Sequence, residues 1–219
     1  MVDFQQRDTS RGLGGDESEA DESDDEQPTE DDESHHHGDG DEHARDESHH
    51  GHDDDHGHHH HDVESLGAAV VTVSSSRTLD DDPAGDAITA AFEREGHEVV
   101  ARELVGDAHG AVRDTVDALA ASADVDTVVT TGGTGVTPYD VTIEAVSDLF
   151  DQELPGFGEL FRMLSYDEIG TRIVGTRATA GIVGETPVFC LPGSENAARL
   201  GAEAIIVEEA GHLAGLAGR

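Results

Sequence analysis

The chain has 219 residues, 50 acidic residues against 12 basic ones, and a formal net charge of −38 at pH 7. All 12 basic residues are Arg, and they form no basic patch of the kind that neutralises nucleic-acid phosphates, which excludes a nucleic-acid partner. No run of about 18 apolar residues is present, which excludes a membrane-spanning helix.

Residues 1–62 have a composition unlike the rest of the chain. They hold 23 Asp and Glu, 12 His and 3 Arg, with almost nothing apolar. Such a segment cannot bury enough surface to offset the entropy lost on ordering, so we expect a disordered, acidic, His-rich tail. Residues 63–219 show regular apolar patterns and are long enough to form one domain with a sizeable core.

The histidines of the tail are clustered at 35–37, 49–50 and 58–61, among carboxylates. Neutral imidazole binds Zn²⁺, Ni²⁺ and Cu²⁺ well, so one interpretation is a metal-buffering arm. The other is a solvated, low-complexity leader that keeps the protein soluble in salt. We favour the second interpretation.

The acid excess extends into the expected domain. Residues 1–62 carry a net charge of −20 and residues 63–219 a net charge of −18. This charge repels itself at ordinary ionic strength, whereas the Debye length falls to about 3 Å at 1 M salt. The composition therefore predicts a halophilic protein. The absence of a signal-peptide pattern and the single cysteine, Cys190, lead us to expect a cytoplasmic location.

The domain alternates strand and helix patterns along the chain. Strands are expected at 66–73, 99–105, 125–131 and 188–191, and helices at 86–95, 111–121, 138–149, 157–164 and 195–216. This alternation implies right-handed crossovers and a mostly parallel sheet with helices on both faces. The predicted fold class is α/β, a three-layer sandwich. Cys190 lies in an apolar run and is expected to be a small buried hydrophobe.

Small, polar and acidic residues follow the predicted strands. They are found at 75–77, 106–107, 131–135 and 192–194. Ligands of open α/β sheets bind outside the carboxyl ends of the strands. The pattern therefore places a candidate binding site at this edge of the sheet.

The stretch TTGGTGVTPYDVT, residues 130–142, has a structural interpretation. Thr137 can cap a helix, Pro138 suits the first helical position, and Asp140 has the spacing of a capping box. The glycines would then supply positive φ angles for a tight turn.

The same stretch also fits a phosphate cradle. Glycines let backbone N–H groups approach an anion, and the following helix presents its positive end to it. Thr131 and Thr134 can add hydroxyl donors. Asp140 would repel a phosphate unless a cation lay between them, and Mg²⁺ is the ion usually held by one or two carboxylates plus phosphate oxygens. Asp107 could be the second carboxylate. Spacing alone leaves both interpretations open.

Four stretches, in order, resemble the MoaB/Mog family of molybdenum cofactor biosynthesis proteins. They are SSRT (75–78), TTGGTGVTPYDVTIE (130–144), GFGELFRMLSYDEIG (156–170) and LPGS (191–194). The resemblance covers nearly all of residues 63–219 and implies the molybdopterin-binding fold, as a homotrimer or hexamer. It implies molybdopterin and Mg-ATP as substrates, adenylyltransferase activity with release of pyrophosphate, and a partner protein that inserts molybdate or tungstate.

The resemblance also implies roles for individual residues. Asp107 and Asp140 match the two essential acidic positions, expected to be catalytic and to hold Mg²⁺. The residues expected to bind molybdopterin and ATP are Ser76, Arg77, Thr131, Gly132, Gly133, Thr134, Gly135, Glu159, Arg162, Pro192, Gly193 and Ser194.

Some alternatives remain at this stage. The domain could bind molybdopterin without catalysis, although the presence of both Asp107 and Asp140 favours the enzyme. Arg162 could instead form a structural ion pair with Glu159. His109 is expected to be an ordinary surface residue.

Overall fold

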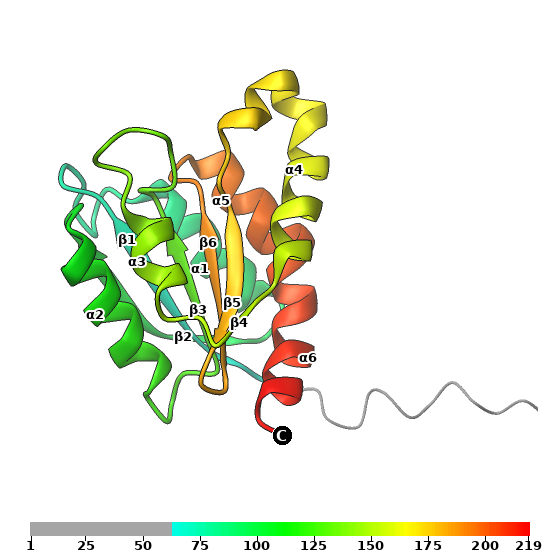
Figure 1. The fold of residues 1–219 in the computed structure, drawn as a ribbon. Helices are drawn as coiled ribbons and strands as arrows, with labels where there is room; N and C mark the ends of the chain where they lie inside the picture. The colour runs from blue at the N-terminus through cyan, green and yellow to red at the C-terminus, as the bar shows by residue number, and fades with distance from the viewer. Residues whose placement is uncertain (1–62) are drawn as a thin grey trace, which may run out of the picture. The chain divides into compact units, whose positions relative to one another are not determined.

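The computed structural model describes residues 63–219 (Figure 1). The predictions of a disordered tail, of its end at residue 62 and of metal binding by its histidines lie outside the described residues. The strands are β1 (Gly67–Val73), β2 (Glu98–Val105), β3 (Thr127–Thr131), β4 (Gln152–Glu153), β5 (Thr179–Val183) and β6 (Thr186–Leu191). The helices are α1 (Pro83–Arg94), α2 (His109–Ala120), α3 (Thr142–Ser147), α4 (Pro155–Ile169), the 3₁₀ helix η2 (Gly170–Gly175), α5 (Glu195–Gly201), the π-helix η3 (Ala202–Ile206) and α6 (Val207–Ala217).

The strands form one six-stranded sheet in the order β2-β1-β3-β6-β5-β4. The first four are parallel, and β5 and β4 extend the sheet in antiparallel pairings. The predicted three-layer α/β fold with a mostly parallel sheet is confirmed. The sequence analysis missed β5, which returns the chain to the sheet beside β6. No helix within residues 63–219 is long and apolar enough to cross a membrane.

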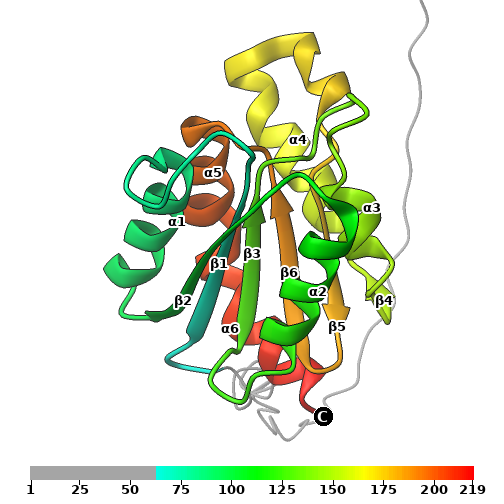
Figure 2. The ribbon, with the colours of Figure 1, turned by 90° about the vertical axis from the view of Figure 1, so that its left-hand side faces the viewer.

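Helices cover both faces of the sheet, and each face has its own apolar core (Figure 2). Strand β1 contributes to both cores because successive side chains of a strand point to opposite faces. Val70 packs in the cluster that contains Phe92 of α1 and Phe161 of α4. Val71 packs in the cluster that contains Val112 of α2. This alternation packs β1 between the two apolar cores and fixes the position of its carboxyl end at the edge of the sheet.

A buried carboxylate sets the beginning of α1. The Asp82 side chain accepts hydrogen bonds from the Gly85 N–H at 3.1 Å and from the Thr72 hydroxyl at 2.6 Å. Arg102 of β2 donates to the same carboxylate at 3.0 Å and pairs with Asp86 at 2.7 Å. Asp82 is thus an N-cap with a cationic partner. The helix therefore starts at Pro83, three residues before the predicted position.

Two other helices differ from their predicted lengths. Helix α4 runs over 15 residues from Pro155 to Ile169, beyond the predicted range 157–164. The predicted helix 195–216 is divided by the π-helix Ala202–Ile206 into α5 and α6. Gly201 precedes this segment and packs tightly, since a Cβ there would lie 2.3 Å from a Leu191 methyl carbon.

Candidate functional site

Hydrogen bonds join the carboxyl ends of β1 and β2. The Ser75 N–H donates to Asp107 Oδ2 at 3.0 Å, and the Asp107 N–H donates to Ser75 Oγ at 3.2 Å. The Ser74 hydroxyl accepts from the N–H groups of Ser76 and Arg77, each at 3.2 Å. This reciprocal pairing fixes the Asp107 carboxylate beside the end of β1.

The glycine loop, residues 132–135, lies against the ends of β1 and β6. Gly132 has a φ of 97° and donates its N–H to the Leu191 carbonyl at 3.0 Å. A Cβ at position 132 would lie 2.4 Å from the Val73 carbonyl oxygen, and one at Gly193 would lie 3.0 Å from the Gly132 Cα. Only glycine combines this φ with such close backbone approach. The loop after β3 is therefore packed directly onto its two neighbouring strand ends.

Helix α3 anchors the other side of the glycine loop. Thr142 donates its hydroxyl to the Gly132 carbonyl at 2.8 Å and its N–H to the Gly133 carbonyl at 3.0 Å. Within residues 63–219, neither the Gly133 N–H nor the Thr134 N–H donates a hydrogen bond. Unpaired N–H groups in a concave glycine turn are suited to an anion.

The structure corrects the expected helix cap at Thr137. Helix α3 starts at Thr142, four residues after the predicted Pro138. Residues 137–140 instead form a turn, in which Asp140 donates its N–H to the Thr137 carbonyl at 3.0 Å. The Asp140 carboxylate accepts from the Thr137 N–H at 2.8 Å and from its hydroxyl at 2.6 Å. The Thr-Pro-x-Asp spacing is compatible with a turn as well as with a helix cap. The hydrogen bonds of Thr142 to the glycine loop set the start of α3 at Thr142 instead of Pro138.

These contacts keep Asp140 ionised. The Thr137 hydroxyl is the main cause that holds the pKa of the Asp140 carboxyl below its ordinary value. Partial burial opposes this shift of the pKa, while the N–H groups of Thr137 and Gly135 and the charge of Arg177 support it. Asp140 is therefore a carboxylate at neutral pH.

A cavity of about 350 Å³ opens on the glycine loop. Its lining residues are Gly132, Gly133, Thr134, Gly135, Asp140, Gly175, Thr176, Pro192 and Gly193. None of them is basic. An anion in this glycine cavity would meet backbone N–H groups and one carboxylate, so its charge requires a cation as well.

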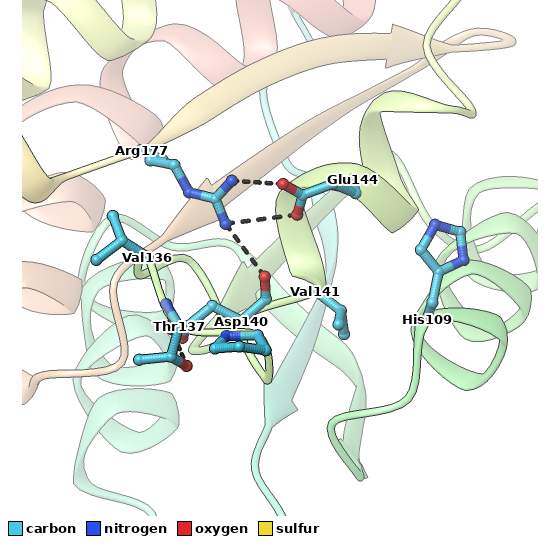
Figure 3. A pocket seen from close by; sticks show the side chains of 8 residues that line it. His109, Val136, Thr137, Asp140, Val141, Glu144 and Arg177 are labelled. Atoms are coloured by element: carbon cyan, nitrogen blue, oxygen red, sulfur yellow. Dashed lines mark hydrogen bonds and ion pairs between the residues drawn. The ribbon is translucent and has the colours of Figure 1, made fainter.

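A second cavity of about 530 Å³ adjoins the first and shares Asp140 with it. Its lining residues are His109, Val136, Thr137, Pro138, Asp140, Val141, Glu144 and Arg177 (Figure 3). Arg177 donates to both oxygens of Glu144, to the Asp140 carbonyl at 3.1 Å and to the Thr134 carbonyl at 3.4 Å.

Arg177 was missed in the sequence analysis, and His109 was expected to be an ordinary surface residue. His109 is exposed, as expected for a surface residue, and it also lines the second cavity at the start of α2, with Nε2 3.7 Å from Asp148. Arg177 precedes β5, the strand that was not predicted, and its partners lie 33 to 43 positions away in the sequence. The only sequence feature that could have indicated Arg177 was its position as a single Arg just before an apolar run.

The remaining predicted site residues are arranged as follows. Thr131 lies outside the cavity lining, and its hydroxyl donates to the Pro192 carbonyl at 3.0 Å, so it joins two loops instead of offering a free donor. Ser194 caps α5 through the Ala197 N–H. The predicted site residues that line neither cavity also include Asp107, Ser76, Arg77, Glu159 and Arg162.

The structural alternative for Arg162 finds no support. Within residues 63–219, Glu159 and Arg162 form no ion pair with each other. The Arg162 guanidinium instead lies against Gly158, where a Cβ would be 3.0 Å from its Nη1.

Asp140 lines both cavities, whereas Asp107 lines neither of them. Their carboxylates are the donor type that a magnesium ion bound with phosphates would use. The hydrogen bonds that Asp107 and Asp140 receive from Ser75 and Thr137 fall on Oδ2, so each carboxylate keeps Oδ1 outside these bonds. Within residues 63–219 no three His, Cys, Asp or Glu side chains gather into an all-protein metal site. Mg²⁺ commonly takes one or two carboxylates and completes its shell with phosphate oxygens and water.

The structure is an α/β sheet with a glycine loop and two carboxylates at its carboxyl edge, where ligands of open α/β sheets bind. Comparisons with known proteins identify the family. Residues 69–212 match the family described as "Probable molybdopterin binding domain". The chain is 44% identical over 145 residues to molybdenum cofactor biosynthesis protein B of Bacillus subtilis, which covers 66% of this chain and 85% of that protein. The chain belongs to the MoaB/Mog family of molybdenum cofactor biosynthesis proteins.

Solved structures agree with this assignment. A crystal structure of a molybdenum cofactor biosynthesis protein B has 42% sequence identity and a TM-score of 0.69, over 72% of this chain and 99% of that one. The tungsten cofactor synthesizing protein MoaB from Pyrococcus furiosus has 38% identity and a TM-score of 0.61, over 72% and 99% of the two chains.

Proposed function

We propose that this protein is a molybdopterin adenylyltransferase that transfers AMP from Mg-ATP to the terminal phosphate of molybdopterin and releases pyrophosphate. The observation that carries the proposal is the glycine cavity, which is lined by Asp140 and by Gly133 and Thr134, whose N–H groups donate no hydrogen bond within residues 63–219. A module that only binds a phosphate group needs no more than the N–H groups. An ionised carboxylate beside them is suited to a reaction that brings two polyanions together with a cation.

In the proposed reaction, an oxygen of the pterin phosphate attacks the α-phosphorus of ATP, and the bond to the β-phosphate oxygen breaks. The attacking oxygen is already ionised at neutral pH, so no strong base is required. The protein's work is to position the two reactants and to stabilise charge in the transition state. The glycine loop does both, because its N–H groups are fixed by contacts with Val73, Leu191 and Thr142.

Asp107 and Asp140 are the proposed ligands of Mg²⁺, which when bound masks the repulsion between phosphate groups. Each carboxylate is oriented by a neighbour, Asp107 by Ser75 and Asp140 by Thr137. Pro192 and Gly193 line the same cavity, and we propose that they contact the nucleotide. We also propose substrate contacts for Ser76, Arg77 and Ser194, which line neither cavity.

Pyrophosphate release tests the proposal. The protein is incubated with Mg-ATP in molar KCl, with and without molybdopterin, and pyrophosphate is measured by a coupled assay. We expect release only when molybdopterin is present. Tight molybdopterin binding without any release would replace the enzyme by a non-catalytic carrier module.

We also propose that the protein acts as a homotrimer or hexamer and passes its product to a partner that inserts molybdate or tungstate. Support for self-association comes from exposed apolar side chains on α4 and η2, among them Met163 at 65%, Tyr166 at 54% and Val174 at 87% exposure. Sedimentation velocity in molar KCl measures the assembly, and a monomer at micromolar concentration would contradict it.

The acidic surface leads us to propose that the domain requires concentrated salt, and Cys190 provides the readout. Its side chain is fully buried, and burial raises the pKa of the thiol to about 12. The native protein should therefore resist thiol-labelling reagents. We expect no labelling in about 2 M KCl and rapid labelling below about 0.1 M KCl, where charges are poorly screened. A thiol that stays protected at low salt would contradict the salt requirement.

A further inference from the structure

The segment from Thr134 to Asp140 contributes residues to the lining of both cavities and carries the proposed metal ligand. Its side chains face outward at the tip, where Val136 and Tyr139 are each 76% exposed. Its internal hydrogen bonds close the turn between Thr137 and Asp140. Such an exposed turn has little apolar packing to hold it in place.

All hydrogen bonds that join this segment to another part of residues 63–219 come from one side chain. Arg177 donates Nε to the Thr134 carbonyl at 3.4 Å and Nη2 to the Asp140 carbonyl at 3.1 Å. These two acceptors are the first and last residues of the segment. The guanidinium thus bridges both ends of the turn. Figure 3 shows its bonds to the Asp140 carbonyl and to Glu144.

Glu144 completes the arrangement on the opposite side of the guanidinium. Both carboxylate oxygens of Glu144 accept from Arg177, and this contact lowers the pKa of Glu144. Glu144 lies on α3, whose first residue, Thr142, is bonded to the glycine loop. Arg177 is therefore held by the same helix that fixes the glycine loop.

We propose that Arg177 is a positioning residue that sets the Asp140 carboxylate for the metal-bound phosphates by clamping both ends of the segment 134–140. The fork of the guanidinium is essential, because it reaches two carbonyls and a carboxylate at once, whereas a lysine ammonium is a point charge. This inference rests on the proposed function for its catalytic consequence, but the clamp itself is a property of the fold.

The first test is hydrogen exchange of backbone amides in Arg177→Gln, Arg177→Lys and the wild type. Arg199→Gln is the matched control, since Arg199 also pairs with a partly exposed glutamate, Glu195, but contacts no loop of the site. We expect exchange in 134–140 to accelerate about tenfold or more in Arg177→Gln, as expected for the loss of hydrogen bonds to a charged group. Arg177→Lys should recover only part of this protection, and Arg199→Gln should match the wild type.

The second test uses Mn²⁺ as a spectroscopic probe for the magnesium position. Electron paramagnetic resonance measures the affinity for Mn²⁺ in the presence of ATP, without any need for turnover. We expect about tenfold weaker Mn²⁺ binding in Arg177→Gln and unchanged binding in Arg199→Gln. In the pyrophosphate assay the same variant should need more Mg²⁺ for half-maximal rate, with the KM for molybdopterin nearly unchanged.

The outcomes separate the clamp from the activity. Unchanged exchange in 134–140 of Arg177→Gln, or equal acceleration throughout the chain, would overturn the clamp. Faster exchange confined to 134–140 with unchanged Mn²⁺ affinity would overturn the positioning role. If the wild type releases no pyrophosphate, the adenylyltransferase fails, while exchange and Mn²⁺ binding still decide the role of Arg177.

Discussion

Asp140→Asn should lower kcat about 10²–10³-fold, as expected when one preorganised electrostatic group is removed from a transition state. The dissociation constant for molybdopterin should change less than about threefold, because binding relies on backbone N–H groups that the substitution leaves in place. An asparagine oxygen can still accept from the Thr137 N–H, so the turn is retained while the charge is lost. Steady-state kinetics and equilibrium binding on the same preparation measure both quantities.

Asp117→Asn is the matched control, because Asp117 is exposed on α2 and lines neither cavity. It should leave kcat and binding unchanged. Equal losses of turnover and binding in Asp140→Asn would mean that Asp140 only shapes the loop. Full activity in Asp140→Asn would remove it from the metal site.

Gly132→Ala should destabilise the domain by about 3 kcal/mol or more, since a backbone clash adds to the strain of a positive φ. The φ of Gly132 is 97°, and the new Cβ would lie 2.4 Å from the Val73 carbonyl oxygen. Relief requires the loop after β3 to move away from β1, which also separates Gly132 from Leu191. Denaturant unfolding in molar KCl measures the change in free energy, and molybdopterin binding should weaken in parallel.

Gly96→Ala separates the cost of a positive φ angle from the cost of a steric clash of the new Cβ. Gly96 has a φ of 85°, close to that of Gly132, but a Cβ there would meet nothing within 4 Å. Its cost should therefore be only the left-handed strain of about 1–2 kcal/mol. Similar costs for the two substitutions would show that the close approach of Gly132 to β1 does not contribute to stability.

The fold could be predicted from the sequence for those elements whose burial produces a clear apolar pattern. The apolar run that became β1 and the β-branched run that became β3 are buried on both faces, and such continuous runs are typical of parallel strands. Strand β5 (TAGIV) was missed because it is only five residues long and begins shortly after a 3₁₀ helix. Its antiparallel pairing with β6 is set by a two-residue turn at Gly184 and Glu185, a signal that the sequence analysis did not use.

The candidate site was predictable to the extent that it lies within contiguous motifs. The glycine loop and Asp140 stand within nine residues of each other, and their proximity follows from the chain itself. Whether Thr137 caps a helix or closes a turn depended on the bonds of Thr142 to the glycine loop, which local spacing does not reveal. Arg177 reaches the site through an unpredicted strand, so no pattern near residue 177 could indicate its partners.

The most direct test of the account follows phosphorus labels through one turnover. The protein is mixed in molar KCl with Mg²⁺, molybdopterin and ATP labelled with ³²P at either the α- or the γ-phosphate, and the products are separated. The account predicts that the α label enters a molybdopterin adduct and that the γ label leaves as pyrophosphate. Transfer of the γ label to the pterin, or an α label that never leaves ATP while molybdopterin stays bound, would contradict it.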